Sequence, residues 1–395
     1  MIPYGRQWID DADIQAVIDT LRSDWLTQGP AIGRLEAAFT ELCRVPHAVA
    51  VNSATSALHI ACLAIGAGPG DVVWTVPNTF VASANCARLC GADVDFVDID
   101  PRTYNISIPA LRQKLVEAKA AGRLPKAIIP VHFSGRATDQ DAIWALAKEY
   151  GFRVIEDASH SVGATHQGEP IGSCRWSDVT VFSFHPVKIV TTAEGGLATT
   201  RDAELADRMA RLRTHGVTKD ERLLSRKDEG GWYYEQIELG LNYRLTDLQA
   251  ALGLSQLRRL EEFLQRRREL VARYDRLLVD VPVQRPLVDL IDESAWHLYV
   301  IRIDAKRAGK TRRQVYDDMR AAGIGVQLDS VDQRAEHRRG FSSDGGVVQR
   351  YFELLNLLGI DLGEPWVEAD PGRGSFAQPS SKQLLLALKL CQTVT

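Results

Sequence analysis

The sequence predicts an α/β fold: a mostly parallel central sheet flanked by helices, followed by a smaller α+β unit. Short apolar strings rich in β-branched residues recur, and helical patterns at residues 55–66 and 141–151 separate several of them. Ligands of such sheets gather at the carboxyl ends of the strands. The strings are AVAV (48–51), DVDFVDI (93–99), AIIPVHF (127–133), FRVIED (152–157) and VTVFSF (179–184).

A change of pattern further along the chain predicts a second domain. Over residues 245–280, leucines recur three or four residues apart with Arg and Glu between them, which predicts one long amphipathic helix or two in series. An apolar strand pattern at 295–304 and a helical pattern at 311–323 follow. We therefore expect a large α/β domain over residues 1–245, and a connecting helix with a small α+β domain over 246–395.

Composition and charge are those of an ordinary soluble globular protein. Of the 395 residues, 45% are hydrophobic and 25% are charged, and a net charge of −4 gives no attraction to nucleic acid or to an anionic membrane. The first residues lack a cationic stretch followed by an apolar one, and no stretch approaches 18 uninterrupted apolar residues. Six cysteines are scattered without paired spacing, so we expect a reduced, cytoplasmic protein without a metal site.

Three polar features follow predicted strands, and the first is VNSATSALHIA at residues 51–61. A strand runs there through small polar residues into a helix, so the backbone N–H groups around Ala54, Thr55 and Ser56 point outward at the helix N-terminus. Unpaired donors and the positive end of the helix dipole bind a phosphate at such a position. An ordinary Ser or Thr N-cap fits the same residues.

The second feature is Asp157 in RVIEDASHS, at the carboxyl end of a predicted strand, with His160 three residues later. A carboxylate in this position can hold a heteroaromatic cation by a charge-assisted hydrogen bond, and this bond strengthens when water is excluded from the site. Taken alone, an Asp at a strand end is more often a helix cap or a salt-bridge partner.

The third feature is Lys188 in FSFHPVKIVTTAEGG, just beyond the next predicted strand. A lysine near an apolar wall and other positive groups loses proton affinity and becomes a usable amine nucleophile. A solvated turn lysine is the alternative.

Together the three features match one cofactor. A phosphate-binding helix start, an Asp on a later strand and a reactive Lys after the following strand are the three anchors of pyridoxal 5′-phosphate (PLP): its phosphate, pyridine nitrogen and aldehyde. Six motifs resemble, in order and spacing, those of the sugar-nucleotide aminotransferases often named after DegT and StrS. They are SATSALHIACLA, PNTFVASANC, VIEDASHSVGA, FSFHPVKIVTTAEGG, RTHGV and LNYRLTDLQAALGLSQL. The resemblance covers roughly residues 1–325 and implies a PLP-dependent transferase of fold-type I.

The resemblance implies roles around the cofactor ring. Lys188 matches the lysine that binds the cofactor covalently and acts as general base, and Asp157 matches the partner of the pyridinium nitrogen. His160 matches a residue that lies against the ring near its phenolic oxygen. Phe80 in PNTFVAS matches the aromatic residue that stacks on the ring.

The resemblance also implies contacts with the cofactor phosphate. Thr55, Ser56 and Ser183 match phosphate contacts, and Asn242 matches an asparagine that reaches the phosphate from a neighbouring subunit. That last role implies a homodimer with shared active sites. By itself, Asn242 fits a turn or cap residue equally well.

The reaction implied is an amino transfer. The sequence is most similar to family members that move an amino group from L-glutamate to the C4 keto group of a UDP-linked 4-keto-6-deoxy-N-acetylhexosamine, as in pseudaminic acid biosynthesis. A dTDP-sugar substrate is an alternative, whereas the family's dehydratases have a histidine at the position of Lys188. His132, His185 and His215 fit either the substrate site or structural hydrogen bonds.

The chain departs from the family pattern after about residue 326. In place of a segment rich in His, Tyr and Pro that approaches the substrate, it reads QLDSVDQRAEHRRGFSSDGG. A catalytically impaired homologue, or a binding protein that retains the fold, is therefore the alternative to an active enzyme.

Overall fold

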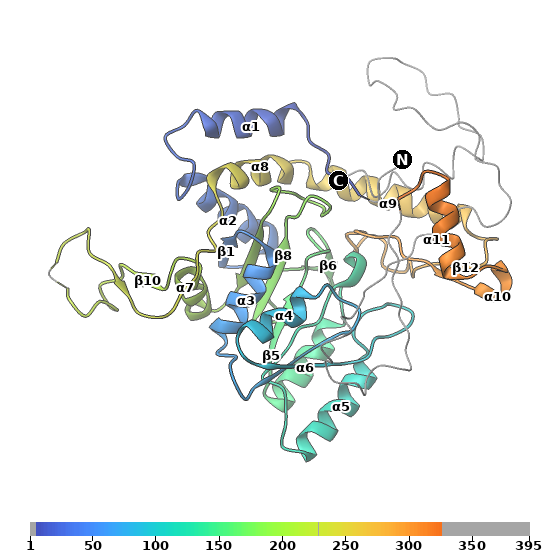
Figure 1. Cartoon of the computed structure of the whole chain (residues 1–395), viewed down its shortest axis with the longest axis horizontal. Coiled ribbons are helices and arrows are strands. Elements are labelled where there is room, and N and C mark those ends of the chain that lie inside the picture. The colour runs from blue at the N-terminus through green and yellow to red at the C-terminus, as the bar shows by residue number, and fades with distance from the viewer. Residues whose placement is uncertain (1–4, 228, 326–395) are drawn as a thin grey trace.

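The computed structural model describes residues 5–227 and 229–325, and at its centre lies a seven-stranded sheet (Figure 1). The strand order is β1-β9-β8-β5-β4-β2-β3. Neighbours from β8 to β3 pair in parallel, and only β9 runs against its neighbours β1 and β8, which confirms the predicted mostly parallel sheet. The strands are β1 (His47–Val51), β2 (Val72–Thr75), β3 (Asp93–Phe96), β4 (Ala127–Ile128), β5 (Arg153–Asp157), β8 (Val179–Ser183) and β9 (Gly196–Thr200).

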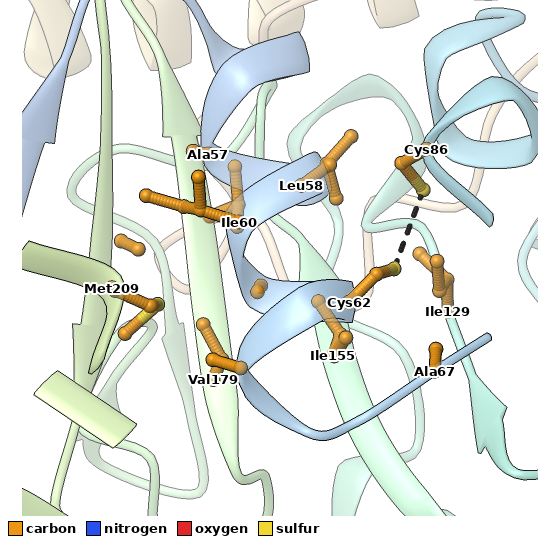
Figure 2. Packing of buried hydrophobic residues seen from close by; sticks show 14 of the residues in the cluster. Ala57, Leu58, Ile60, Cys62, Ala67, Cys86, Ile129, Ile155, Val179 and Met209 are labelled. Carbon is orange, nitrogen blue, oxygen red and sulfur yellow. Dashed lines mark hydrogen bonds between the residues drawn. The ribbon is translucent and has the colours of Figure 1, made fainter. Parts of the chain in front are cut away.

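Successive strand residues pack on opposite faces of this sheet. In β1, Val49 and Val51 join one hydrophobic cluster, whereas Ala50 joins another. Figure 2 shows the first cluster around α3, where Cys62 points toward Cys86 of α4 and their Sγ atoms are 3.7 Å apart. The helices that contribute to this cluster are α3 (Ala54–Ala64), α4 (Ala82–Leu89) and α7 (Ala203–Leu212).

The opposite face of the sheet carries two further groups of helices. Around Trp74 and Ile128, α5 and α6 cover the strands from β5 to β3, and around Phe182 and Leu197, α2 and α8 cover the other end. The first helix, α1, lies on α8. These helices are α1 (Asp11–Leu21), α2 (Pro30–Cys43), α5 (Ile108–Ala120) and α6 (Gln140–Tyr150).

The predicted amphipathic segment forms two helices in series, α8 (Asp247–Leu257) and α9 (Leu260–Leu277). They break at Arg258 and Arg259, whose backbone N–H groups bond to carbonyls three residues back and so close a tighter turn. Together the two helices run from the central sheet to the small unit (Figure 1).

The small unit has a core of its own, in which Leu270 and Tyr274 of α9 pack against Trp296 and Met319. Its aromatic side chains stack, with the rings of Tyr274 and Tyr299 4.7 Å apart. Its elements are β12 (Val283–Gln284), β13 (Arg302–Ile303), α10 (Ala305–Ala308) and α11 (Arg312–Ala321).

The strand predicted at 295–304 is wrong for most of its length, because only β13 pairs in a ladder. The earlier residues bond instead to the turn η1 (Phe133–Gly135) that follows β4. The Ala295 N–H donates to the Gly135 carbonyl at 3.0 Å, and the Leu298 N–H donates to the Ser134 carbonyl at 3.2 Å. These bonds join the small unit to the carboxyl end of the sheet.

Two hairpins complete the described chain, and one of them, β10–β11, projects beyond α7 (Figure 1). None of the helices in residues 5–325 is long and apolar enough to cross a bilayer. The atypical segment that begins near residue 326 lies outside the described residues. The hairpin strands are β6 (Thr165–His166), β7 (Glu169–Pro170), β10 (Val217–Thr218) and β11 (Glu235–Gln236).

Candidate active site

The predicted phosphate-binding segment forms the start of α3, directly after β1. Ser53 is the N-cap, and its Oγ accepts from the Ser56 N–H at 3.1 Å, so that one predicted phosphate donor is used within the helix. In residues 5–325, the N–H groups of Ala54 and Thr55 donate no hydrogen bond. Ser53 caps the helix, as the alternative interpretation expected, and phosphate binding by the outward N–H groups of Ala54 and Thr55 stays a prediction; Thr55 is exposed while Ser56 is buried.

Gly196 allows the chain to pass directly beneath this helix start. A Cβ at Gly196 would lie 2.5 Å from the backbone nitrogen of Ala54, which no side chain permits. Gly196 pairs with Val51 on one side and with Ser183 on the other. This register brings the buried Ser183, at the end of β8, to the same edge of the sheet as the start of α3.

Asp157 is the last residue of β5 and is only 5% exposed. Its Oδ2 accepts from the Ser83 hydroxyl at 2.6 Å, and its Oδ1 accepts from the Ser159 N–H at 3.1 Å. The Ser83 hydroxyl in turn lies 2.7 Å from Thr79 Oγ1. The sequence analysis missed Ser83, although it lies one helical turn after Phe80, within the PNTFVASANC motif.

Lys188 lies in a turn after β8, where its N–H donates to the His185 carbonyl at 2.8 Å. The next two residues, Ile189 and Val190, are buried in the core and hold the turn against the protein. Burial lowers the pKa of the Lys188 amine to about 8, although the negative charge of Asp157 acts in the opposite direction. The lysine therefore has a substantial neutral fraction near physiological pH.

His160 is half-buried and has a defined hydrogen-bonding state. The Ser134 N–H donates to its Nδ1 at 3.3 Å, which assigns the ring proton to Nε2. Burial and the nearby Lys188 cation lower the pKa of His160 well below its usual range, so the ring is neutral. The position after β5 thus offers one N–H donor beside Asp157.

A second imidazole, that of His297, was missed by the sequence analysis and comes from the small unit. Its ring stacks on that of His160, with centroids 4.4 Å apart and an interplanar angle of 28°. The only signal in the sequence is a lone histidine within the apolar run AWHLYVIRID. The partner is 137 positions earlier in the chain, and nothing in the local pattern connects the two.

Two predicted residues lie on the surface. Phe80, just before α4, is 69% exposed, which leaves its ring free to stack on a ligand. Asn242 is exposed on a segment that bridges to Thr214. His132, in contrast, is fully buried, and its Nδ1 accepts from the Thr138 N–H at 3.0 Å, which is a structural role.

These groups fit PLP, judged on this geometry alone. Outward N–H donors and a glycine cradle suit a phosphate, a buried carboxylate suits a pyridinium nitrogen, and an amine of lowered pKa suits an aldehyde. The sheet order and this constellation at the carboxyl ends of its strands define the class: a PLP-dependent transferase of fold-type I.

Comparison with known proteins identifies the family. The chain belongs to the DegT/DnrJ/EryC1/StrS aminotransferase family, whose model matches residues 7–333. It is 43% identical over 317 residues to the spore coat polysaccharide biosynthesis protein SpsC of Bacillus subtilis, covering 80% of this chain and 79% of SpsC. The protein is therefore a PLP-dependent aminotransferase.

Solved structures agree in fold. Helicobacter pylori PseC, an aminotransferase of pseudaminic acid biosynthesis, is 32% identical, superposes with a TM-score of 0.76, and covers 86% of this chain and 88% of its own. Spr1654 of Streptococcus pneumoniae in its PMP form is 31% identical, with a TM-score of 0.73 and 83% of each chain covered. The same protein is also known in a PLP form, with a TM-score of 0.72.

Proposed function

We propose that this protein is a sugar-nucleotide aminotransferase. It transfers an amino group from L-glutamate to the C4 keto group of a UDP-linked 4-keto-6-deoxy-N-acetylhexosamine, as in pseudaminic acid biosynthesis. The observation that carries the reaction type is Lys188, an amine whose pKa burial lowers to about 8, at the strand ends beside Asp157. The similarity to PseC supports the choice of substrate.

The residues divide the work between holding the cofactor and moving a proton. When bound, PLP supplies an electron sink for the amino transfer. Lys188 Nζ would hold the cofactor before substrate arrives and, once released, would take the Cα proton of the donor. Proton transfer by a positioned base is worth about 10²–10⁴-fold.

Asp157 keeps the ring nitrogen protonated, because its carboxylate is already fixed by Ser83 and by the Ser159 N–H. With PLP bound, the Nε2–H of His160 would donate to its phenolic oxygen, and Phe80 would stack on its ring. At the other end of the site, Thr55 and Ser183 would hold the phosphate at the start of α3, whereas both donors of Ser56, the third predicted contact, are used within the chain by Ser53 Oγ and Asn52 Oδ1.

The working form is a homodimer in which Asn242 reaches the partner's phosphate. Its exposure supports this role, since a residue that contacts a second chain is open in one chain alone. Exposed apolar side chains on the adjacent β10–β11 hairpin also support it, because they require cover. They are Leu223, Trp232, Tyr234, Ile237 and Leu239.

The proposal is tested by supplying the purified full chain with L-glutamate and with UDP-linked and dTDP-linked 4-keto-6-deoxy sugars in turn. Mass spectrometry of the products should show an amino group in place of the keto oxygen for the UDP-linked N-acetylhexosamine. Product from a dTDP sugar alone would overturn the substrate assignment and leave the reaction type standing. A yellow protein that L-glutamate does not bleach would overturn the amino transfer itself.

A further inference from the structure

Within residues 5–227 and 229–325, His297 is a buried side chain whose ring nitrogens have no hydrogen-bond partner. The residue is 6% exposed, its Nδ1 is fully enclosed, and no residue in the described part of the chain hydrogen-bonds either ring nitrogen. Nδ1 is enclosed and open to no ligand, whereas Nε2 is not among the enclosed atoms, and an imidazole nitrogen without a partner beside an active site indicates a ligand.

The backbone around His297 is held tightly, so the unpaired ring is not a consequence of a loose segment. Arg267 donates from Nη1 to the Trp296 carbonyl at 2.9 Å and to the His297 carbonyl at 3.2 Å. Gly135 adopts φ +100° and leaves no room for a Cβ, which would lie 2.9 Å from the backbone nitrogen of His297. Contacts from Arg267 and Gly135, both distant in sequence, therefore hold the backbone that places this ring against His160.

The charges around His297 favour an anion. Burial, and after it the charges of His160, Lys188 and Arg267, lower the pKa of His297 well below its usual range, so its ring is neutral. A neutral imidazole has one N–H donor, and the positive charge of Arg267, joined by that of Lys188 when its amine is protonated, attracts negative charge to it.

The two substrates of the proposed reaction carry their negative charges at different distances from the reacting atom. In an amino-acid donor, the α-carboxylate is bonded to the carbon whose proton Lys188 takes. In a sugar nucleotide, the diphosphate is on C1, across the sugar ring from the C4 keto group. A residue beside Lys188 and His160 is therefore placed for the carboxylate.

We propose that His297 binds the α-carboxylate of the amino donor through its ring N–H, and so recognises the donor and not the sugar. This rests on the proposed function, because it requires Lys188 to be the reacting amine. In this role, the small unit contributes a substrate contact to a site otherwise built on the large sheet.

The test uses His297→Phe, which keeps a ring stacked on His160 and removes both nitrogens, and His297→Asn, which keeps an N–H donor and removes the ring. Bleaching of the yellow holoenzyme is followed against L-glutamate concentration. For His297→Phe we expect the half-saturating donor concentration to rise about tenfold or more, and for His297→Asn to rise less. The half-saturating concentration of the keto sugar in the second half-reaction stays within about twofold of wild type.

A binding measurement without turnover completes the test. Calorimetric titration of the holoenzyme with glutarate, a dicarboxylate that cannot react, should give a dissociation constant about tenfold weaker in His297→Phe. His166→Phe is the matched control, because His166 pairs with Asp141 and not with the site residues. This variant should leave the half-saturating concentration of L-glutamate and the dissociation constant of glutarate unchanged.

The inference would be overturned if His297→Phe raised the half-saturating concentrations of donor and sugar equally, or left glutarate binding unchanged. Either result would show that His297 only packs against His160. The glutarate result is independent of the reaction. A wild-type protein that L-glutamate does not bleach contradicts the proposed function, whereas a wild-type protein that is bleached, with a variant that binds glutarate equally well, contradicts only the role of His297.

Discussion

The two ends of the cofactor site are built in different ways. At the phosphate end, the outward donors come from the backbone at the start of α3, with Gly196 packed directly beneath. At the ring end, Asp157, His160 and His297 are side chains from two structural units, held by one another and by hydroxyls. The first end depends on a local backbone conformation, and the second on contacts between distant segments.

This difference predicts how each end responds to mutation. A backbone site tolerates side-chain changes that leave space, and fails when the backbone is displaced. A side-chain site tolerates small backbone shifts, and fails when a single functional group is removed. The predictions below test this contrast.

Removing the Lys188 amine should have the largest effect. Lys188→Ala loses both the covalent attachment and the general base, so turnover should fall by at least about 10³-fold. The phosphate end is untouched in this variant, and PLP should still bind, without the longer-wavelength absorbance band of the lysine-bound form. Near wild-type turnover would refute the assignment of Lys188, and complete loss of PLP binding would show that the two ends are not independent.

The lowered pKa of Lys188 predicts a pH dependence of cofactor attachment to the apo-protein. Only the neutral amine reacts, and with a pKa of about 8 about one amine in a hundred is neutral at pH 6 and about half at pH 8. The rate of yellow colour formation after adding PLP should therefore rise about fiftyfold from pH 6 to pH 8 and level off above pH 9. Stopped-flow absorbance measures this rate, and a rate that still rises nearly tenfold between pH 8 and pH 9 would show an ordinary lysine.

The same contrast explains how much could be predicted from the sequence. The apolar strings predicted strands of the central sheet, and a helix start or a strand end can be located from its own neighbours, so Lys188, Asp157 and the start of α3 could be proposed from the sequence. Ser83 and His297 act through partners more than 70 positions away, and local periodicity carries no information on such pairs. The strand predicted around His297 failed for that reason: its backbone donors bond to a turn in the large unit.

Crowding the phosphate end should have an intermediate effect. In Gly196→Ala, the new Cβ would lie 2.5 Å from the backbone nitrogen of Ala54 and 2.5 Å from the carbonyl carbon of Ser53. Overpacking of this kind costs about 1–3 kcal/mol. We expect a lower Tm and PLP affinity weaker by about tenfold. Gly33→Ala is the control, since nothing lies within 4 Å of its Cβ and alanine favours the helix α2 there. Equal effects of the two substitutions would contradict the importance of the close approach.

The smallest expected effect concerns Ser83, which does not contact the cofactor and acts only on Asp157. Ser83→Ala removes the hydrogen bond at 2.6 Å and leaves the carboxylate with the Ser159 N–H alone. We expect turnover to fall by about three- to tenfold, because a hydrogen bond to a charged group contributes about 1.5–3 kcal/mol and the remaining donor retains part of it.

Ser83→Thr separates this role from simple packing. It keeps the hydroxyl and adds a methyl group, so it should restore turnover and the absorbance spectrum of bound PLP, while Ser83→Ala shifts that spectrum as the ring nitrogen loses proton affinity. A purely structural Ser83 would give the reverse order, because the added methyl crowds a site with no exposed surface and alanine does not. The ring end would then depend on packing in the way the phosphate end does, and the proposed difference between the two ends would not apply to Ser83.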